Sequence, residues 1–131
     1  MKKVFVNGTF DILHTGHLEM LLYARSQGDS LTVAIDSDRR VKALKGDSRP
    51  INTDVERAML LFYLKPVDYV VIFDTDKELT EMISQHDIMV KGSDYKSKPI
   101  VGQEVCKELI FFELIDGYST TKKIQDITNR R

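Results

Sequence analysis

Short apolar runs alternate with amphipathic stretches along the chain. The runs are rich in β-branched and aromatic residues. Most of them are continuous rather than interrupted by polar residues, which is typical of strands that are covered on both faces of a sheet. We expect five strands, at residues 3–7, 31–35, 69–73, 88–90 and 109–114.

Four other stretches place apolar residues three to four positions apart, as a helix with one buried face does. Gly28 ends the first stretch and Pro66 follows the second. The predicted helices cover residues 16–28, 53–64, 76–86 and 119–130. This alternation predicts an α/β fold, in which helices flank a parallel five-stranded sheet through right-handed crossovers. We expect a single Rossmann-like domain over residues 1–131.

Two polar connections are predicted to be irregular and to lie near a ligand. They are residues 39–52 ("RRVKALKGDSRPIN") and residues 92–102 ("GSDYKSKPIVG"). Each follows a predicted strand, so each belongs to the carboxyl edge of the sheet, where parallel sheets bind ligands.

The stretch "VNGTFDILHTGH" (residues 6–17) joins the first predicted strand to the first predicted helix. Gly8 and Thr9 begin a tight turn where the backbone can approach a ligand, and Asp11 could fix this turn by bonding local amides. The helix is expected to begin between residues 15 and 17, and its free amides form an anion site. Because His14 and His17 are three positions apart, both imidazoles can face one ligand.

The residues alone leave three interpretations of this stretch open. It is neither a dinucleotide fingerprint nor a P-loop, because G-x-G-x-x-G and G-K-[ST] are both missing. Two histidines could hold a metal, although His86 lies elsewhere and no cysteine or carboxylate is spaced as a further ligand. They could also be purely structural. A phosphate site is favoured over both.

Composition narrows the classes of partner and compartment. The 19 basic and 20 acidic residues give a net charge of −1, so no overall attraction to nucleic acid or to an anionic membrane is expected. No apolar run approaches the ~20 residues of a membrane span, and the N-terminus lacks the apolar core of a signal peptide. Cys106 is the only cysteine; we expect it on a helix, as a small buried or half-buried residue. These features predict a cytoplasmic protein.

Two motifs at opposite ends of the chain resemble a known family. "GTFDILHTGH" matches the G-x-F-D-x-x-H-x-G-H signature of the cytidylyltransferase-like nucleotidyltransferases, and "GYSTTKKI" is similar to the hydroxyl-rich run that opens their last helix. The chain most resembles the adenylyltransferase domain of bifunctional heptose-phosphate kinase/adenylyltransferases, through "SDRRVKALKGDSRPIN", "VKGSDYK" and "DGYSTTKKI". Glycerol-3-phosphate cytidylyltransferases typically carry an arginine before the last motif, and "LIDGYSTT" has none.

The resemblance implies transfer of a nucleotidyl group to a phosphorylated acceptor. The nucleophile is then a phosphate oxygen that is already ionised at neutral pH, so catalysis rests on alignment and charge neutralisation. Mg²⁺ would shield the triphosphate. His14 and His17 would contact the phosphates and stabilise the transition state, and Lys45 would reach the acceptor phosphate or the α-phosphate. Asp11 would mainly hold the loop beside the substrates.

The same resemblance implies a set of nucleotide-binding residues. Thr9 and Phe10 would offer backbone amides. Arg57, otherwise read as a surface arginine, would anchor a phosphate or a loop. Gly92 would contact the ribose and base, and a tight left-handed turn without ligand contact is the alternative for it; both could hold. The full expected set is Gly8, Thr9, Phe10, Asp11, His14, His17, Arg57, Gly92, Asp94, Tyr95, Ser119, Thr120 and Thr121, with Lys45 and Asp11 as substrate-binding residues.

The favoured function is that of a D-glycero-D-manno-heptose 1-phosphate adenylyltransferase, which makes ADP-heptose. The alternative is a cytidylyltransferase that uses CTP with glycerol 3-phosphate or another polyol or sugar phosphate. A nucleotide-binding module without catalysis is a third hypothesis, which the intact pair of histidines disfavours. The resemblance also suggests a homodimer, in which Phe62, Tyr63 and Tyr69 could line the interface; they could equally belong to the core.

Overall fold

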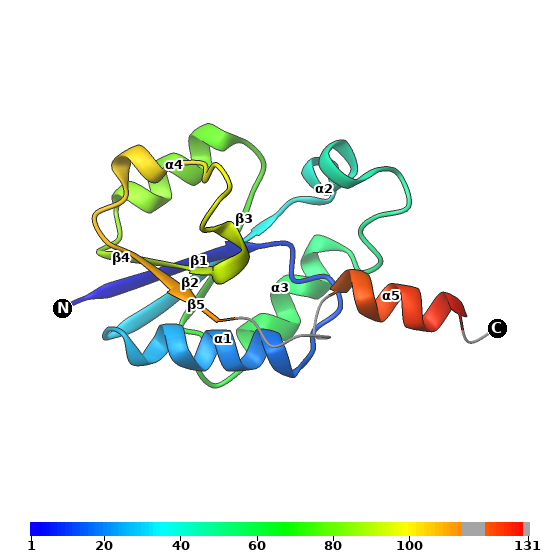
Figure 1. The fold of residues 1–131 in the computed structure, drawn as a ribbon, viewed down its shortest axis with the longest axis horizontal. Coiled ribbons are helices and arrows are strands. Elements are labelled where there is room, and N and C mark those ends of the chain that lie inside the picture. Colours follow the sequence, from blue (N-terminus) through cyan, green and yellow to red (C-terminus); the bar gives the residue numbers. More distant parts are fainter. Residues whose placement is uncertain (114–119, 130–131) are drawn as a thin grey trace.

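A parallel five-stranded sheet forms the centre of the molecule (Figure 1). The computed structural model describes residues 1–113 and 120–129. The strands are β1 (Lys3–Gly8), β2 (Ser30–Asp36), β3 (Tyr69–Phe73), β4 (Ile88–Gly92) and β5 (Leu109–Phe112). Their spatial order is β3-β2-β1-β4-β5. The chain builds the sheet outward from β1 to β3, then crosses back to β4 on the other side of β1, so the switch point lies between β1 and β4. At such a switch point the carboxyl ends of neighbouring strands open a crevice that binds ligands.

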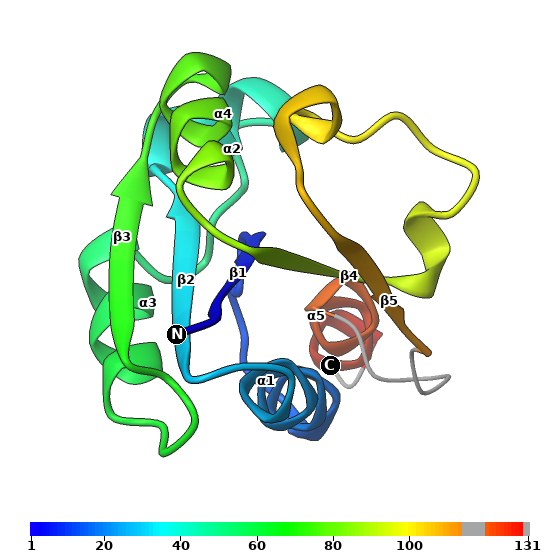
Figure 2. The same cartoon turned by 90° about the vertical axis from the view of Figure 1, so that its left-hand side faces the viewer.

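Helices cover both faces of this sheet (Figure 2). Helix α1 (Thr15–Ser26) and helix α3 (Asp54–Phe62) pack on one face, and helix α4 (Asp76–Ser84) packs on the other. Helix α2 (Asp38–Lys45) follows β2, and helix α5 (Thr120–Asn129) follows β5. Two short 3-10 helices, η1 (Ser93–Tyr95) and η2 (Gln103–Val105), lie between β4 and β5.

Two apolar clusters, one on each face, hold the layers together. The first cluster includes Val4, Val6, Leu21, Leu31, Val33 and Leu61, and it lies between the sheet and the α1 and α3 side. The second includes Phe5, Ala34, Phe73, Leu79, Ile83 and Met89, and it lies on the α4 side. Alternate residues of β1 therefore point into different clusters, as the pleat of a strand requires. Continuous apolar runs were predicted for strands with two covered faces, and β1, β2 and β4 confirm that interpretation. It is wrong for the edge strand β3, where Tyr69, Val71 and Ile72 are more than a third exposed.

The predicted elements are confirmed except at three places. Residues 39–52 were expected to be irregular, but α2 occupies their first half. The Ser37 hydroxyl caps it by accepting a hydrogen bond from the amide of Arg40 at 3.1 Å, and only Val41 is buried on it, so no apolar stripe marked it in the sequence. Cys106 was expected on a helix, but its backbone is extended just after η2. Its half-buried environment is as predicted.

The third correction concerns the aromatic residues near β3. Phe62, Tyr63 and Tyr69 are all more than half exposed, so the alternative that they belong to the core is wrong. The last residue of the predicted strand 109–114 lies outside the described residues. None of the helices within residues 1–113 and 120–129 has the length and apolar character needed to cross a membrane.

Candidate active site

Two cavities lie side by side at the carboxyl edge of β1 and β4. The Lys45 cavity has a volume of about 250 Å³ and is bounded by Lys45, Asp36, Arg40 and residues 99–101. The His17 cavity, of about 170 Å³, is bounded by His17, Phe10, Met20, Gly92 and Asp94. Both cavities are also lined by Asn7, Gly8, Thr9, Lys91 and Tyr95. Their shared wall is thus formed by the first motif and by the end of β4.

The two histidines of the motif form the start of α1. His14 is the N-cap residue, and its Nδ1 accepts a hydrogen bond from the amide of Gly16 at 3.1 Å. The amide of His14 donates in turn to Nδ1 of His17 at 3.3 Å. The rings stack with their centroids 3.8 Å apart. Since each Nδ1 accepts a hydrogen bond, each neutral ring carries its own proton on Nε2, so Nε2–H is the donor of the ring.

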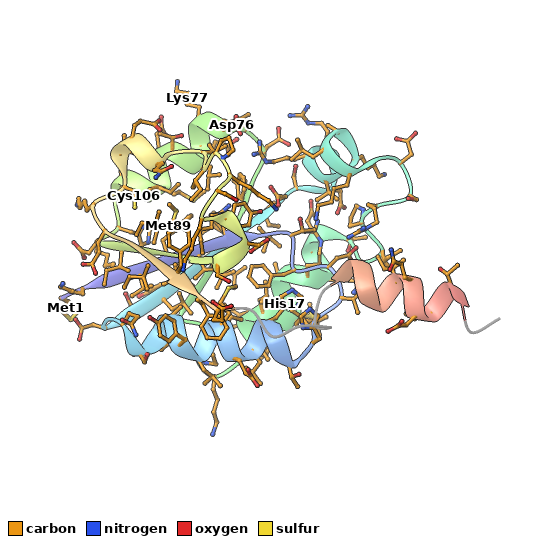
Figure 3. All side chains as sticks on the ribbon, viewed as in Figure 1. Met1, His17, Asp76, Lys77, Met89 and Cys106 are labelled. Atoms are coloured by element: carbon orange, nitrogen blue, oxygen red, sulfur yellow. The ribbon has the colours of Figure 1, made fainter. Side chains whose placement is uncertain are left out.

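His17 projects from the first turn of α1 (Figure 3) and packs against Phe10, with ring centroids 5.1 Å apart. Burial, together with the neighbouring His14, lowers the pKa of His17 from 6.5 to about 4. The imidazole is therefore neutral at physiological pH. The neutral ring donates one hydrogen bond, through Nε2–H, to a phosphate and adds no positive charge to the site.

Phe10 gives the turn between β1 and α1 its shape. Its φ is 50°, in the left-handed region, although it is not a glycine. Its ring folds back over Gly8, where an added Cβ would meet the ring at 3.0 Å. A glycine is needed at position 8 because of this close approach, and the turn keeps the amides of Thr9 and Phe10 at the edge of the cavities.

Asp11 holds a segment that is forty residues further along the chain. Its carboxylate is fully buried and accepts hydrogen bonds from the amides of Ile51 at 2.7 Å and Asn52 at 2.8 Å. The side chain of Asn52 donates back to the carbonyl of Asp11 at 3.0 Å, and Nε of Arg49 lies 3.6 Å from the same carboxylate. Asp11 was predicted to hold a loop, but through amides of its own turn; the amides that it binds belong to the connection after α2.

Arg57 is fully buried on α3, so the surface position that its sequence context suggested is wrong. Its guanidinium donates to the carbonyl of Asn52 at 3.1 Å, the carbonyl of Thr9 at 2.9 Å and Oδ1 of Asp38 at 2.9 Å. Arg57 lines neither cavity. Of the two roles expected for it, the geometry corresponds to the loop anchor, because one side chain joins the β1–α1 turn, the start of α2 and the segment before α3.

Lys45 is the last residue of α2 and lines the Lys45 cavity, which His17 does not line. Its pKa is lowered by partial burial and by the positive charge of Arg49, against the opposing effects of Asp36 and Asp11. Asp36 ends β2 and accepts hydrogen bonds from Oγ1 of Thr9 at 3.2 Å and from Nε of Arg40 at 2.8 Å. A cluster of cations therefore faces the cavity from one side, and a carboxylate lies at its floor.

The residues after β4 form the opposite wall. Gly92, Asp94 and Tyr95 line the His17 cavity, as expected of residues that bind a nucleotide. Gly92 has φ −64°, so the alternative of a tight left-handed turn is wrong and the backbone continues in an extended conformation. Nζ of Lys91 lies 4.5 Å from the centroid of the Tyr95 ring. Burial lowers the pKa of Lys91 to about 8, although Asp36 and Asp94 oppose this effect.

Helix α5 carries the second motif. Thr120 is its first residue and Thr121 its second, whereas Ser119 lies outside the described residues. The amino end of α5 lies near the amino end of α1 in both views (Figures 1 and 2). Within the described part of the chain, no group of three or more His, Cys, Asp or Glu side chains is arranged to hold a metal ion.

Sequence reasoning missed several residues that line the cavities. Asn7, Asp36 and Lys91 each follow the apolar run of a strand, and a polar residue in that position was the signal that could have revealed them. Arg40 and Arg49 lie in a segment rich in basic residues, in which the sequence gives no sign of which cation is buried.

Comparisons with known proteins agree with this geometry. The model of the Cytidylyltransferase-like family matches residues 5–127. Three relatives, each called "Bifunctional protein HldE", are similar over most of the chain. They come from Aliarcobacter butzleri (50% identity, 96% of this chain), Campylobacter concisus (48%, 98%) and Sulfurimonas denitrificans (51%, 96%). The chain spans only 27–28% of the length of these relatives.

A solved structure has the same fold. It is the crystal structure of the lipopolysaccharide core biosynthesis protein from Thermoplasma volcanium GSS1, which matches with a TM-score of 0.72 and 24% identity. The match covers 88% of this chain and 99% of that one. At this identity the likeness bears on the fold alone.

Proposed function

Because this chain belongs to the cytidylyltransferase-like family and is therefore a nucleotidyltransferase, we propose that it transfers the adenylyl group of ATP to a sugar phosphate. The favoured acceptor is D-glycero-D-manno-heptose 1-phosphate, which gives ADP-heptose and pyrophosphate. The observation that carries this proposal is the pair of cavities, which meet at Thr9 beside the stacked imidazoles of α1. About 50% identity to the bifunctional HldE proteins supports the choice of acceptor.

We assign the nucleotide to the His17 cavity and the acceptor to the Lys45 cavity. The first is lined by the imidazole of His17 and by Thr9 and Phe10, whose backbone amides suit a triphosphate, and Gly92, Asp94 and Tyr95 on its wall suit the ribose and base. His14 lines neither cavity and stacks on His17 from behind. The second has Lys45 with Arg49 nearby, which suits the phosphate of the acceptor. The hydroxyls of Ser119, Thr120 and Thr121 remain assigned to the β- and γ-phosphates.

In the proposed reaction an oxygen of the acceptor phosphate attacks the α-phosphorus of ATP. The new phosphorus–oxygen bond forms as the bond to pyrophosphate breaks, and pyrophosphate leaves with that electron pair. The nucleophile is already an anion, so no general base is required. The Nε2–H groups of His14 and His17 and the amides of Thr9 and Phe10 donate to the charge that develops on the phosphate oxygens. Lys45 holds the acceptor phosphate in line.

Mg²⁺ is the proposed cofactor. It would neutralise the oxygens of the triphosphate and of the leaving pyrophosphate. The carboxylate of Asp11 is fully buried, accepts two backbone amides and lines neither cavity, so it does not face a metal ion bound with the triphosphate. We therefore propose that oxygen atoms of the triphosphate itself would bind Mg²⁺.

A panel of nucleotides and phosphorylated acceptors, scored for release of pyrophosphate, tests the proposal. Turnover with ATP and heptose 1-phosphate is expected. Turnover only with CTP and a polyol phosphate would contradict it and favour the alternative cytidylyltransferase, and calorimetric titration of ATP against CTP separates the two at the level of binding.

Substitution of the histidines tests whether the chain catalyses the reaction or only binds nucleotide. His14→Ala and His17→Ala are each expected to lower kcat by about 100-fold or more, with a smaller loss of nucleotide affinity. His86→Gln is the matched control, because His86 bonds the carbonyl of Met82 and lines neither cavity. Unchanged turnover in both alanine variants would remove the catalytic assignment.

We further propose that residues 1–131 form one nucleotidyltransferase domain that acts in the cytoplasm as a homodimer. Exposed apolar residues beside the edge of the sheet support the dimer. Val55, Met59, Phe62 and Tyr63 lie on or just after α3 and are all more than half exposed. Tyr69 and Val71 of the edge strand β3 are also more than a third exposed, but they point to the α4 side of the sheet. Apolar residues of this kind on both sides of an uncovered edge mark a contact surface.

A further inference from the structure

Three adjacent strands end in polar residues on the same face of the sheet. Asn7 ends the run of β1, Asp36 that of β2 and Lys91 that of β4, and β1 pairs with both of the other strands. Side chains alternate between the faces of a strand. The residue two positions before each of them is, respectively, Phe5, Ala34 and Met89, and all three belong to the apolar cluster on the α4 side. Met89, labelled in Figure 3, marks this layer in the interior of the molecule.

These three side chains form a polar floor under the Lys45 cavity, which we call the Asn7–Asp36–Lys91 floor. Oδ1 of Asn7 is buried and accepts no hydrogen bond from the residues that the structure describes. Lys91 is 93% buried, and no carboxylate of those residues lies within 4 Å of its ammonium group. The floor thus presents an acceptor and a charged donor, and neither has a hydrogen bond or an ion pair to the residues that the structure describes.

Buried polar groups are almost always paired, and a cavity lined by unpaired ones is prepared for a polar ligand. A hydroxyl group is the ligand that fits a floor of this kind, because it donates one hydrogen bond and accepts others. A phosphate does not fit over the same floor, since its charge would lie against the carboxylate of Asp36. Lys45, which lines the cavity and lies close enough to Arg49 for their charges to interact, is the better partner for that charge.

We propose that the Asn7–Asp36–Lys91 floor binds the hydroxyl groups of the acceptor, and that it thereby selects a polyhydroxylated sugar or polyol phosphate whose phosphate group faces Lys45. This inference rests on the proposed function, because it takes the Lys45 cavity as the acceptor site. Asn7 and Asp36 accept from the hydroxyls, and Lys91 donates to them. The ring of Tyr95 lies against the ammonium group of Lys91 and keeps it in place at the cavity.

The ribose of the nucleotide is a second source of hydroxyls, since Asn7 and Lys91 line both cavities. Asp36 decides between the two sources. It lines only the Lys45 cavity, whereas Gly92 and Asp94 line only the His17 cavity. The three-residue floor as a whole therefore faces the acceptor.

Equilibrium binding to two variants, Lys91→Met and Asn7→Leu, tests the inference. Heptose 1-phosphate is titrated by calorimetry into protein saturated with a non-hydrolysable ATP analogue. Each variant is expected to raise the Kd for the sugar phosphate by about 10- to 100-fold, as expected when a hydrogen bond that involves a charged or buried partner is removed. The Kd for the ATP analogue is expected to change less than about threefold. Lys96→Met is the matched control, because Lys96 lines neither cavity.

Deoxy analogues of the sugar phosphate give a readout that a purely structural role of Lys91 would not move. The wild-type protein should bind at least one monodeoxy analogue about 10-fold more weakly than the parent sugar phosphate. Lys91→Met should lose that discrimination at the same position. The inference would be overturned if Lys91→Met raised the Kd of the parent sugar phosphate and of every deoxy analogue by the same factor. It would also be overturned if the loss of affinity fell on the ATP analogue instead.

The outcome is separable from that of the proposed function. Absence of pyrophosphate release with every nucleotide would remove the proposed reaction, whereas unchanged binding of the sugar phosphate by both variants would remove only the role of the floor. Circular dichroism monitors folding of the variants. If Lys91→Met does not fold, Asn7→Leu decides with the same expected shift in Kd.

Discussion

The hydrogen bonds of Asp11 give a sharp prediction about stability. Asp11→Asn keeps the shape of the side chain but replaces one carboxylate oxygen with an NH₂ group. Each oxygen accepts a backbone amide, from Ile51 at 2.7 Å and from Asn52 at 2.8 Å. In either orientation of the new amide, one backbone N–H therefore meets a donor in place of an acceptor.

The cost follows from two terms. A hydrogen bond to a charged group contributes about 1.5–3 kcal/mol, and a buried donor left without an acceptor costs about 1–3 kcal/mol. Because the two terms overlap, we expect a loss of about 3–5 kcal/mol in the free energy of unfolding. The chain has 131 residues, so its unfolding entropy is about 0.28 kcal/mol/K and the expected fall in Tm is about 11–18 °C.

Thermal and urea unfolding, followed by circular dichroism, measure this change. The matched control is Asp47→Asn, in the same loop. Asp47 is exposed, and within the described residues its carboxylate has no hydrogen bond or ion pair. The control should shift the free energy of unfolding by less than about 0.5 kcal/mol. Equal, small shifts in the two variants would refute the view that Asp11 holds the 46–53 loop in place.

Three other predictions use different contacts. Arg57→Lys should lower the free energy of unfolding by about 2–4 kcal/mol, because an ammonium group cannot reach two carbonyls and a carboxylate at once; Arg39→Lys, on the surface, serves as the control, and equal losses in urea unfolding would contradict the prediction. Lowering the pH from 7 to 5 should cost about 2 kcal/mol of stability through His17, because the unfolded imidazole, with its pKa of 6.5, takes up a proton that the folded one, with a pKa of about 4, does not. This contribution is fully present above the unfolded pKa and is lost as the pH falls toward 4; a slope that persists in His17→Gln would show another origin. Tyr63→Lys should convert the proposed dimer to a monomer of 15.0 kDa in light scattering, and a wild-type protein that is already monomeric at micromolar concentration would remove the dimer.

The sheet was predictable because its signal is local. Most strands are near-continuous apolar runs, which is typical of a parallel sheet. Their register was not predictable, because a strand that is apolar on both faces does not mark which residues face which layer. Helix α2 was not predictable in the same way, since it buries only Val41 and depends on its cap by Ser37. A helix held by a cap and by charged side chains carries no apolar stripe for sequence analysis to detect.

The same distinction between local signals and long-range contacts applies to the candidate site. The motif with His14 and His17 could be read as an anion site because its chemistry depends on spacing within one turn of a helix. The burial of Arg57 could not be read, because its three partners come from segments that are five to 48 residues away in the sequence. Lys91 lies between these cases, since a lysine at the end of an apolar strand is visible in the sequence but its neighbours are not.

The aspartate of the first motif has consequences for where charge is neutralised in the proposed reaction. Both of its oxygens already accept backbone amides. The cations that line the Lys45 cavity are Arg40, Lys45 and Lys91, and Arg49 adds its charge beside Lys45. Asp11 and Arg57 together join the β1–α1 turn to the 46–53 loop: Asp11 bonds two amides of the loop, and Arg57 bonds the carbonyls of Thr9 and Asn52. The imidazoles on one side and Lys45 on the other are thus fixed relative to each other by two buried side chains. An in-line transfer between two phosphates requires this fixed separation, so a change at either side chain should lower kcat even though neither is assigned a contact with the reacting atoms.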